Sequence, residues 1–208
     1  MTGWSRYFNC WCCWFLVKGG PAGSNRNTFM ALKPTIFKFD VSLSDVDCGR
    51  YEHLNLTVAQ HPSETAERMM ARLLAFCLNA DAGLAFAGGL ASAEEPDIWL
   101  RGLDGQVIKW IDVGEPSLDR LRKASRMARE VLVYSFNTKS DLWWARVGAK
   151  AQMPNVSIIQ FDWSHLQQFT GLLQRTLSLS IGVTDQSAFI AAMENSIEVE
   201  WRTLKHAD

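Results

Sequence analysis

The stretch from Glu94 to Lys123 decides the predicted fold and reads E-E-P-D-I-W-L-R-G-L-D-G-Q-V-I-K-W-I-D-V-G-E-P-S-L-D-R-L-R-K. Three apolar residues follow Asp97, the pair Asp104-Gly105 is a strong hairpin signal, and Val107 to Val113 is a second strand-like run. If the two runs pair about that turn, Asp97 and Asp112 lie near the same end of the sheet. We therefore expect two neighbouring carboxylates at one end of a hairpin.

A helix is predicted directly after the second run, with Pro116 at its entrance. Its basic residues are Arg120, Arg122, Lys123, Arg126 and Arg129. Two carboxylates backed by a basic helix could hold a divalent metal ion beside a phosphate. The alternative is that the two aspartates are turn residues at solvent-exposed strand ends and that the basic residues form a solvated helix face. For the two aspartates, spacing alone favours this second interpretation.

A third carboxylate lies on a helix predicted from about Pro62 to Asn79. Its apolar stripe, placed at 100° per residue, consists of Ala66, Met70, Leu73, Leu74, Cys77 and Leu78. Glu67 falls inside this stripe and Glu64 lies at its edge, whereas Arg68 and Arg72 are expected to point the opposite way. A carboxylate that faces the core is costly unless it is paired or bound to metal, so Glu67 strengthens the metal-site hypothesis. The alternative is that Glu67 only caps the helix or pairs with an arginine.

Composition and charge limit the classes of function. The chain has 208 residues, 48% hydrophobic and 21% charged, which is typical of a globular domain with a sizeable core. The first 29 residues hold three of the 21 basic residues and none of the 22 acidic ones, so the remainder carries a net charge of −4. Nucleic-acid binding would therefore rest on a local patch. The five cysteines show no zinc-site spacing in the body, and this pattern favours a reduced cytoplasmic setting.

Residues 1–29 differ in character from the rest of the chain. Tyr7 to Val17 is an apolar run that is too short to span a bilayer, and a loop-like stretch follows it. The segment Met30-Ala31-Leu32-Lys33 is a more natural start for the folded domain. We expect residues 1–29 to be a non-native-looking or disordered extension outside the fold, and residues 30–208 to form a single domain without a membrane segment. A short membrane anchor is the alternative for the extension.

The remaining pattern predicts an α/β (α+β) fold with mixed β-sheets and flanking helices. Thr35 to Leu43 and Tyr51 to Ala59 alternate as a hairpin at the amino-terminal side. Further strands are expected at Leu84 to Phe86, Val131 to Phe136, Val156 to Phe161, Thr176 to Val183 and Ile197 to Trp201, and helices at Leu118 to Glu130, Ser140 to Ala149 and Asp162 to Leu172. The last strands make a β-rich carboxyl-terminal region.

Four blocks of the sequence resemble the YaeQ family of bacterial proteins. They are H-P-S-E-T-A-E-R-M-M-A-R-L-L-A-F (61–76), E-P-D-I-W-L-R (95–101), W-I-D-V-G-E-P (110–116) and R-L-R-K-A (120–124). The resemblance covers Met30 to the carboxyl end. Together with the pair Pro96-Asp97 and the order of the elements, it implies a divergent PD-(D/E)XK nuclease-like protein with a restriction-endonuclease-like αβββαβ core.

The resemblance also implies a site, which departs from the superfamily pattern at one position. That pattern places a lysine two residues after Asp112, where this chain has Gly114; a lysine from the next helix makes Lys123 the candidate, with Arg120 behind it. On the helical wheel, however, Lys123 lies opposite the apolar side. The implied Mg²⁺ ligands are Glu67, Asp97 and Asp112, which are also the implied catalytic residues together with Lys123; Arg120, Arg122 and Arg126 would bind the substrate.

Two functions remain open at this point. The first is metal-dependent hydrolysis of nucleic-acid phosphodiesters. The alternative is a noncatalytic nucleic-acid-binding or transcription-related regulatory protein that keeps the fold. Gly114 and the acidic body favour the alternative, whereas the three carboxylates favour the enzyme. The sequence does not indicate an oligomeric state.

Overall fold

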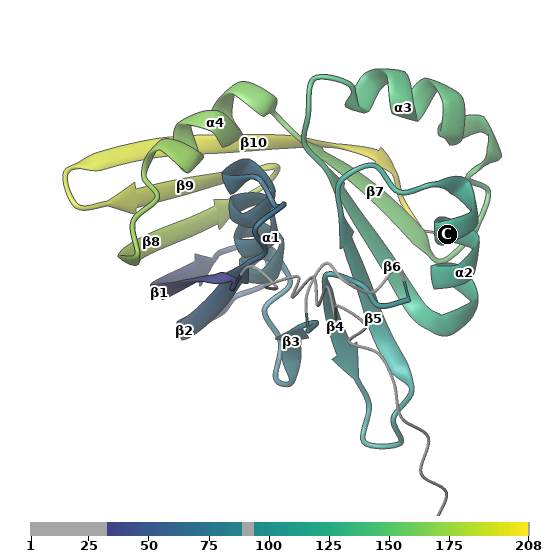
Figure 1. Cartoon of the computed structure of the whole chain (residues 1–208), viewed down its shortest axis with the longest axis horizontal. Helices are drawn as coiled ribbons and strands as arrows, with labels where there is room; N and C mark the ends of the chain where they lie inside the picture. The colour runs from purple at the N-terminus through teal and green to yellow at the C-terminus, as the bar shows by residue number, and fades with distance from the viewer. Residues whose placement is uncertain (1–32, 89–93, 208) are drawn as a thin grey trace, which may run out of the picture. The chain divides into compact units, whose positions relative to one another are not determined.

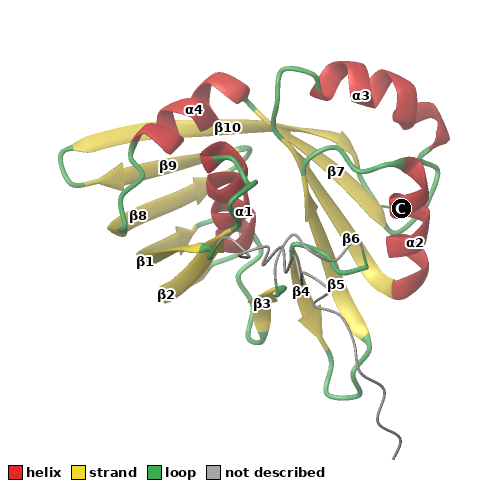
Figure 2. Ribbon diagram, viewed as in Figure 1, coloured by secondary structure: helices red, strands yellow, loops and turns green. Residues whose placement is uncertain are grey.

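The strands form one continuous mixed sheet in the computed structural model, which describes residues 33–88 and 94–207 (Figures 1 and 2). The strands are β1 (Thr35–Asp45), β2 (Arg50–Gln60), β3 (Leu84–Phe86), β4 (Ile98–Arg101), β5 (Val107–Val113), β6 (Ala128–Ser135), β7 (Val156–Phe161), β8 (Thr176–Thr184), β9 (Ser187–Ala192) and β10 (Asn195–Lys205). The helices are α1 (Ala66–Leu78), α2 (Leu118–Met127), α3 (Ser140–Val147) and α4 (Trp163–Gly171), and a 3₁₀ turn, η1, covers Gly148–Lys150. The expectation for residues 1–29 lies outside the described residues.

The strand order is β2-β1-β8-β9-β10-β7-β6-β5-β4-β3, so the predicted class of a mixed α+β protein is confirmed. Two long-range pairings join what the sequence suggested as separate sheets. The amino-terminal hairpin pairs in parallel with β8, with Lys38 opposite Thr176, and β10 pairs antiparallel with β7. We call β2, β1, β8, β9 and β10 the hairpin half of the sheet, and β3 to β7 the cavity half.

Helix α1 lies between the two halves of the sheet (Figure 1), and the main core combines its apolar side chains with those of both halves. Every residue from Met69 to Cys77 is buried. The prediction of an outward-facing Arg72 is therefore wrong, because α1 is enclosed on several sides. The helix also begins later than predicted: Thr65 is its N-cap, and the Thr65 hydroxyl accepts a hydrogen bond from the Arg68 N–H at 3.2 Å.

The cavity half combines antiparallel and parallel pairing. Strands β3, β4 and β5 pair antiparallel, whereas β5, β6 and β7 pair in parallel. Helices α2 and α3 connect the parallel strands, and α2 ends at Met127 rather than at the predicted Glu130, because Ala128 already pairs with Val107. A second core, which includes Trp110, Leu121 and Val133, fills the face of this half under α2 and α3. No helix in the described part of the chain is long and apolar enough to cross a membrane.

Candidate functional site

The predicted hairpin brings Asp97 and Asp112 together. Strands β4 and β5 pair with Ile98 opposite Ile111, and the Asp97 N–H donates to the Ile111 carbonyl at 3.0 Å. Asp97 therefore lies across from Asp112, beside the edge where the parallel strands β5, β6 and β7 end. That edge is where open α/β sheets place their ligands.

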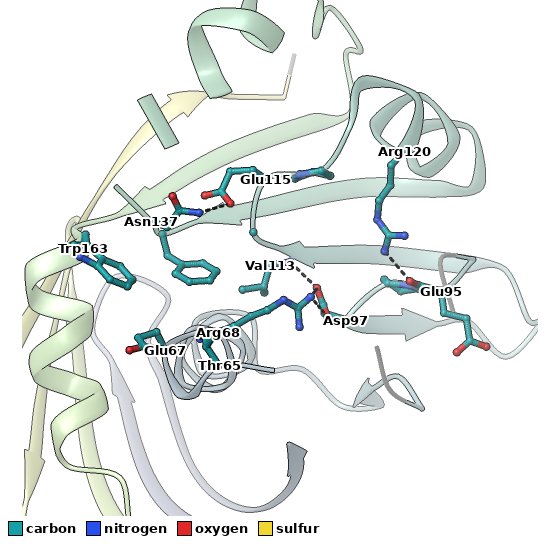
Figure 3. Close-up of a pocket in the computed structure, with 14 residues that line it drawn as sticks. Thr65, Glu67, Arg68, Glu95, Asp97, Val113, Glu115, Arg120, Asn137 and Trp163 are labelled. Carbon is teal, nitrogen blue, oxygen red and sulfur yellow. Dashed lines mark hydrogen bonds and ion pairs between the residues drawn. The ribbon is translucent and has the colours of Figure 1, made fainter. Parts of the chain in front are cut away.

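Asp97 is held by one arginine and one backbone amide. The Arg68 Nη2 donates to both carboxylate oxygens of Asp97, at 2.7 and 2.9 Å, and the Val113 N–H donates to Oδ2 at 2.7 Å (Figure 3). The Asp97 side chain is only 9% exposed. Such charge-assisted bonds satisfy the carboxylate without any metal ion.

Asp112 is held by a different arginine, which comes from α2. The Arg120 Nε and Nη2 donate to separate oxygens of Asp112, each at 2.8 Å, in the two-pronged geometry that a guanidinium favours. The same Nη2 also donates to the Glu95 carbonyl at 2.7 Å. Burial raises the pKa of Asp112 and outweighs the Arg120 hydrogen bond, which lowers it, while the nearby Asp97 charge raises it further.

The buried carboxylate of the α1 region is Glu64, which corrects the prediction for Glu67. The Glu64 side chain is fully buried and forms ion pairs with Arg68 at 3.0 Å and with Arg72 at 2.8 Å. Because Glu64 precedes the helix, its direction does not follow the helical wheel. Glu67 is half-buried, and no described residue donates a hydrogen bond to its carboxylate.

A cavity of about 600 Å³ opens beside these groups (Figure 3). Its walls carry four carboxylates and two guanidinium groups, so the lining has a formal surplus of negative charge. These residues are Glu67, Glu95, Asp97, Glu115, Arg68 and Arg120. Asp112 does not line the cavity, although Arg120 contacts both. The structure thus places Glu67 and Asp97 on one cavity and Asp112 close to it.

The predicted cation Lys123 lies elsewhere. Helix α2 buries Leu121 and Ala124, so Lys123 is turned away from the cavity and pairs with the carboxylate of Glu94. Arg122 pairs with exposed Asp119 at 3.2 Å, and Arg126 is exposed. None of these three α2 cations lines the cavity, whereas Arg120, on the neighbouring face, does.

Magnesium prefers carboxylate oxygens, which the cavity provides. However, Asp97 and Asp112 already accept hydrogen bonds from arginines. Within residues 33–88 and 94–207, no three His, Cys, Asp or Glu side chains are grouped so that they could hold a metal ion. In this arrangement the residues do not fit Mg²⁺, and its binding by Glu67, Asp97 and Asp112 stays a prediction.

Several residues of the site were missed by sequence reasoning. Arg68 joins Glu64 to Asp97, and its spacing of four residues from Glu64 is a helix-pair signal that could have indicated one of the two contacts. Glu115 accepts from the Asn137 Nδ2 at 2.6 Å and from the Ser140 hydroxyl at 2.7 Å. No local pattern relates Glu115 to Asn137, because the pairing of β5 with β6 brings them together.

The fold and the site define an α+β protein with a large mixed sheet and a charged cavity where three parallel strands end. The family model described as YaeQ protein matches residues 30–201. The chain belongs to the YaeQ family, which confirms the resemblance of its four sequence blocks.

Relatives and solved structures agree with this assignment. The proteins named Uncharacterized protein YaeQ from Salmonella typhi and Escherichia coli (strain K12) are both 37% identical, over 173 and 172 residues. These alignments cover 82% of this chain and 96% and 95% of the relatives. Crystal structures of YaeQ protein from Xanthomonas axonopodis pv. citri and from Pseudomonas syringae match with TM-scores of 0.80 and 0.79, at 34% and 32% identity. They cover 83% of this chain and 98% and 97% of those chains.

Proposed function

We propose that the chain is a nucleic-acid-binding protein with a divergent PD-(D/E)XK nuclease-like core that does not hydrolyse its ligand. One observation carries the noncatalytic part: each aspartate of the predicted site is occupied by an arginine, Arg68 on Asp97 and Arg120 on Asp112. A guanidinium stays protonated at all physiological pH values, so it cannot act as a proton acceptor for water as a lysine with a lowered pKa can.

The nuclease-like core is supported by the order of elements from α1 to β6 along the chain. Helix α1, strands β3, β4 and β5, helix α2 and strand β6 follow one another in the αβββαβ order that the family resemblance implies. The Pro96-Asp97 pair precedes β4, and Asp112 lies on the adjacent strand β5. This arrangement favours descent from a phosphodiester-binding ancestor over a coincidental cluster of acids.

Nucleic-acid binding is supported by exposed cations at helical spacing. Arg122 and Arg126 are exposed and lie four residues apart on α2, and exposed Arg129 follows on β6, so these side chains offer positive charge to phosphates. The cavity itself has a surplus of carboxylates, which disfavours a phosphate inside it in the absence of a cation. Bases are therefore the better ligand for the cavity walls, and phosphates for the α2 surface.

A second candidate is metal-dependent hydrolysis of nucleic acid, and Glu67 favours it. Its carboxylate faces an acidic cavity with no partner among the described residues, which is a favourable environment for a cation. Arg120 would then stand where the superfamily pattern expects a lysine. Such an enzyme would need Arg68 to leave Asp97 first.

Two parallel measurements on the full chain distinguish the candidates. Calorimetric titration of Mg²⁺ and Mn²⁺ into the wild type and Asp97→Asn tests the metal site, and incubation with labelled single- and double-stranded oligonucleotides tests binding and cleavage. We expect oligonucleotide binding without cleavage and without metal binding. Metal binding that Asp97→Asn abolishes, together with cleavage, would instead establish the enzyme, and the absence of nucleic-acid binding would overturn the proposal.

A further inference from the structure

A second cavity adjoins the first one and contains a different set of side chains. It has a volume of about 420 Å³ and shares two wall residues, Asn137 and Trp163, with the charged cavity. Its other lining residues come from the segment at the start of α3, from β7, from the α4 N-cap Asp162 and from β10. The two cavities are therefore neighbours on one surface at the carboxyl ends of the parallel strands.

Two tryptophans are among the residues that line the second cavity, whose walls are otherwise mostly polar. Trp163 begins α4 and Trp201 lies on β10, and both are half-buried. Core aromatics support them: Phe136 stacks with Trp163 at 6.4 Å, and Phe161 meets Trp201 edge to face at 6.2 Å. Neither indole N–H donates to another described residue. The rings are thus supported by the core while part of each side chain remains accessible beside the cavity.

Some polar side chains of this cavity are hydrogen-bonded to one another, and others are accessible to a ligand. Arg202 pairs with Asp141, and Gln160 accepts from Arg202 at 3.0 Å and donates to Asp141 at 3.2 Å, so these three side chains satisfy one another. Thr138 makes no side-chain hydrogen bond within the described residues. The Glu200 carboxylate is 62% exposed, and its ion-pair contact is His165 at 4.0 Å.

These features match an unpaired nucleobase better than a phosphate. A base stacks on an indole whatever its identity, because every base has a π-face. The amino and ring N–H groups of a base can donate hydrogen bonds to the Glu200 carboxylate. A phosphate has only acceptor oxygens, and its negative charge would be repelled by that carboxylate. A paired base cannot use this cavity, since its edge and both faces are covered within the duplex.

We propose that the second cavity is a stacking subsite for one unpaired base of single-stranded nucleic acid, with Trp163 and Trp201 as its platforms. This inference rests on the proposed nucleic-acid binding and names the form of the ligand. The strand would continue from the subsite past Asn137 toward the charged cavity. Stacking and base-edge hydrogen bonds, rather than backbone charge, would select single strands.

The test measures binding of a labelled 12-nucleotide single strand, and of the same sequence as a blunt duplex, to the full chain in EDTA. We expect the single strand to bind more tightly, and Trp201→Leu to weaken it about 10- to 100-fold. Trp201→Phe, which keeps an aromatic ring, should retain most of the affinity. Trp99→Leu is the matched control, because Trp99 lines neither cavity, and we expect it to change the affinity less than twofold.

A fluorescence measurement on the wild type guards against a variant that fails to fold. A 2-aminopurine base in the single strand should be quenched on binding if it stacks on an indole. Binding that is equal for single strand and duplex, unaffected by Trp201→Leu and free of quenching would overturn the subsite but leave the proposed function standing. No binding to either form would overturn both, and displacement of the strand by an oligosaccharide would reassign the cavity to a carbohydrate.

Discussion

The two halves of the sheet differ in how they hold charge. In the cavity half, Asp112 lies in the interior with an arginine partner. The α1 region, between the halves, adds the buried pair of Glu64 and Arg72, and Arg72 also donates to the Ala59 carbonyl of β2. In the hairpin half the buried charge among the described residues is Asp45, the last residue of β1, which accepts from the Cys48 N–H at 3.0 Å. The ion pair of Asp40 with His53 is about half exposed.

This difference indicates that the cavity half keeps a buried charged side chain although it does not maximise stability. Well-packed apolar side chains often stabilise a core as well as a buried ion pair does, because desolvation offsets the attraction between the charges. The hairpin half follows that rule, with apolar residues such as Phe39, Val41 and Ile181 in its interior. The cavity half departs from it at buried Asp112, beside the edge where the proposed ligand sites lie, which favours a functional reason for that charge.

The largest expected effect comes from breaking the Glu64 ion pairs. Glu64→Ala leaves buried Arg72 without its carboxylate partner and removes one of the two carboxylates that Arg68 contacts, so we expect the free energy of unfolding to fall by ~3–5 kcal/mol. Urea denaturation followed by circular dichroism measures it. Asp40→Ala in the hairpin half is the matched control and should cost no more than ~0.5–1 kcal/mol, because that pair is solvent-exposed. Equal losses in the two variants would remove the contrast between the buried Glu64 ion pairs and the exposed ion pair of the hairpin half.

An intermediate effect concerns the dependence of stability on pH. The raised pKa of Asp112 means that its carboxyl group holds a proton more strongly in the folded protein than in the unfolded chain. The corresponding stabilisation is fully present below the ordinary carboxyl pKa and is lost as the pH rises through the raised value. Relative to Asp112→Asn, the wild type should therefore lose stability across that window in urea denaturation at a series of pH values. Parallel curves for the two proteins would contradict the assignment.

The smallest expected effect comes from Lys123. It pairs with exposed Glu94 and lies outside the cavity, so Lys123→Met should leave both stability and oligonucleotide binding unchanged within experimental error. Arg120→Met, three residues earlier on the same helix, removes the partner of buried Asp112 and should reduce stability clearly. Thermal unfolding of the two variants side by side makes this comparison, and a larger effect of Lys123→Met would restore the lysine as the cation of the site.

Local sequence signals predicted the elements of the cavity half well. The hairpin about Asp104-Gly105 and the neighbouring positions of Asp97 and Asp112 are confirmed, because turn chemistry and strand pattern act within a few residues. The charged residues were harder to place. Glu64 and Arg72 are buried because α1 is surrounded by other elements, which a helical wheel cannot show.

The sequence by itself determined the family, the α+β class, most strands and helices, and the pairing of the two aspartate-bearing strands. These follow from side-chain periodicity, turn residues and specific blocks of sequence. Only the tertiary structure decided the single continuous sheet, the position of α1 between its halves, and the choice of arginine for each aspartate. Those features depend on contacts between residues far apart in the chain, such as Arg68 with Asp97 and Lys38 with Thr176, whose formation depends on how the whole sheet closes around the core.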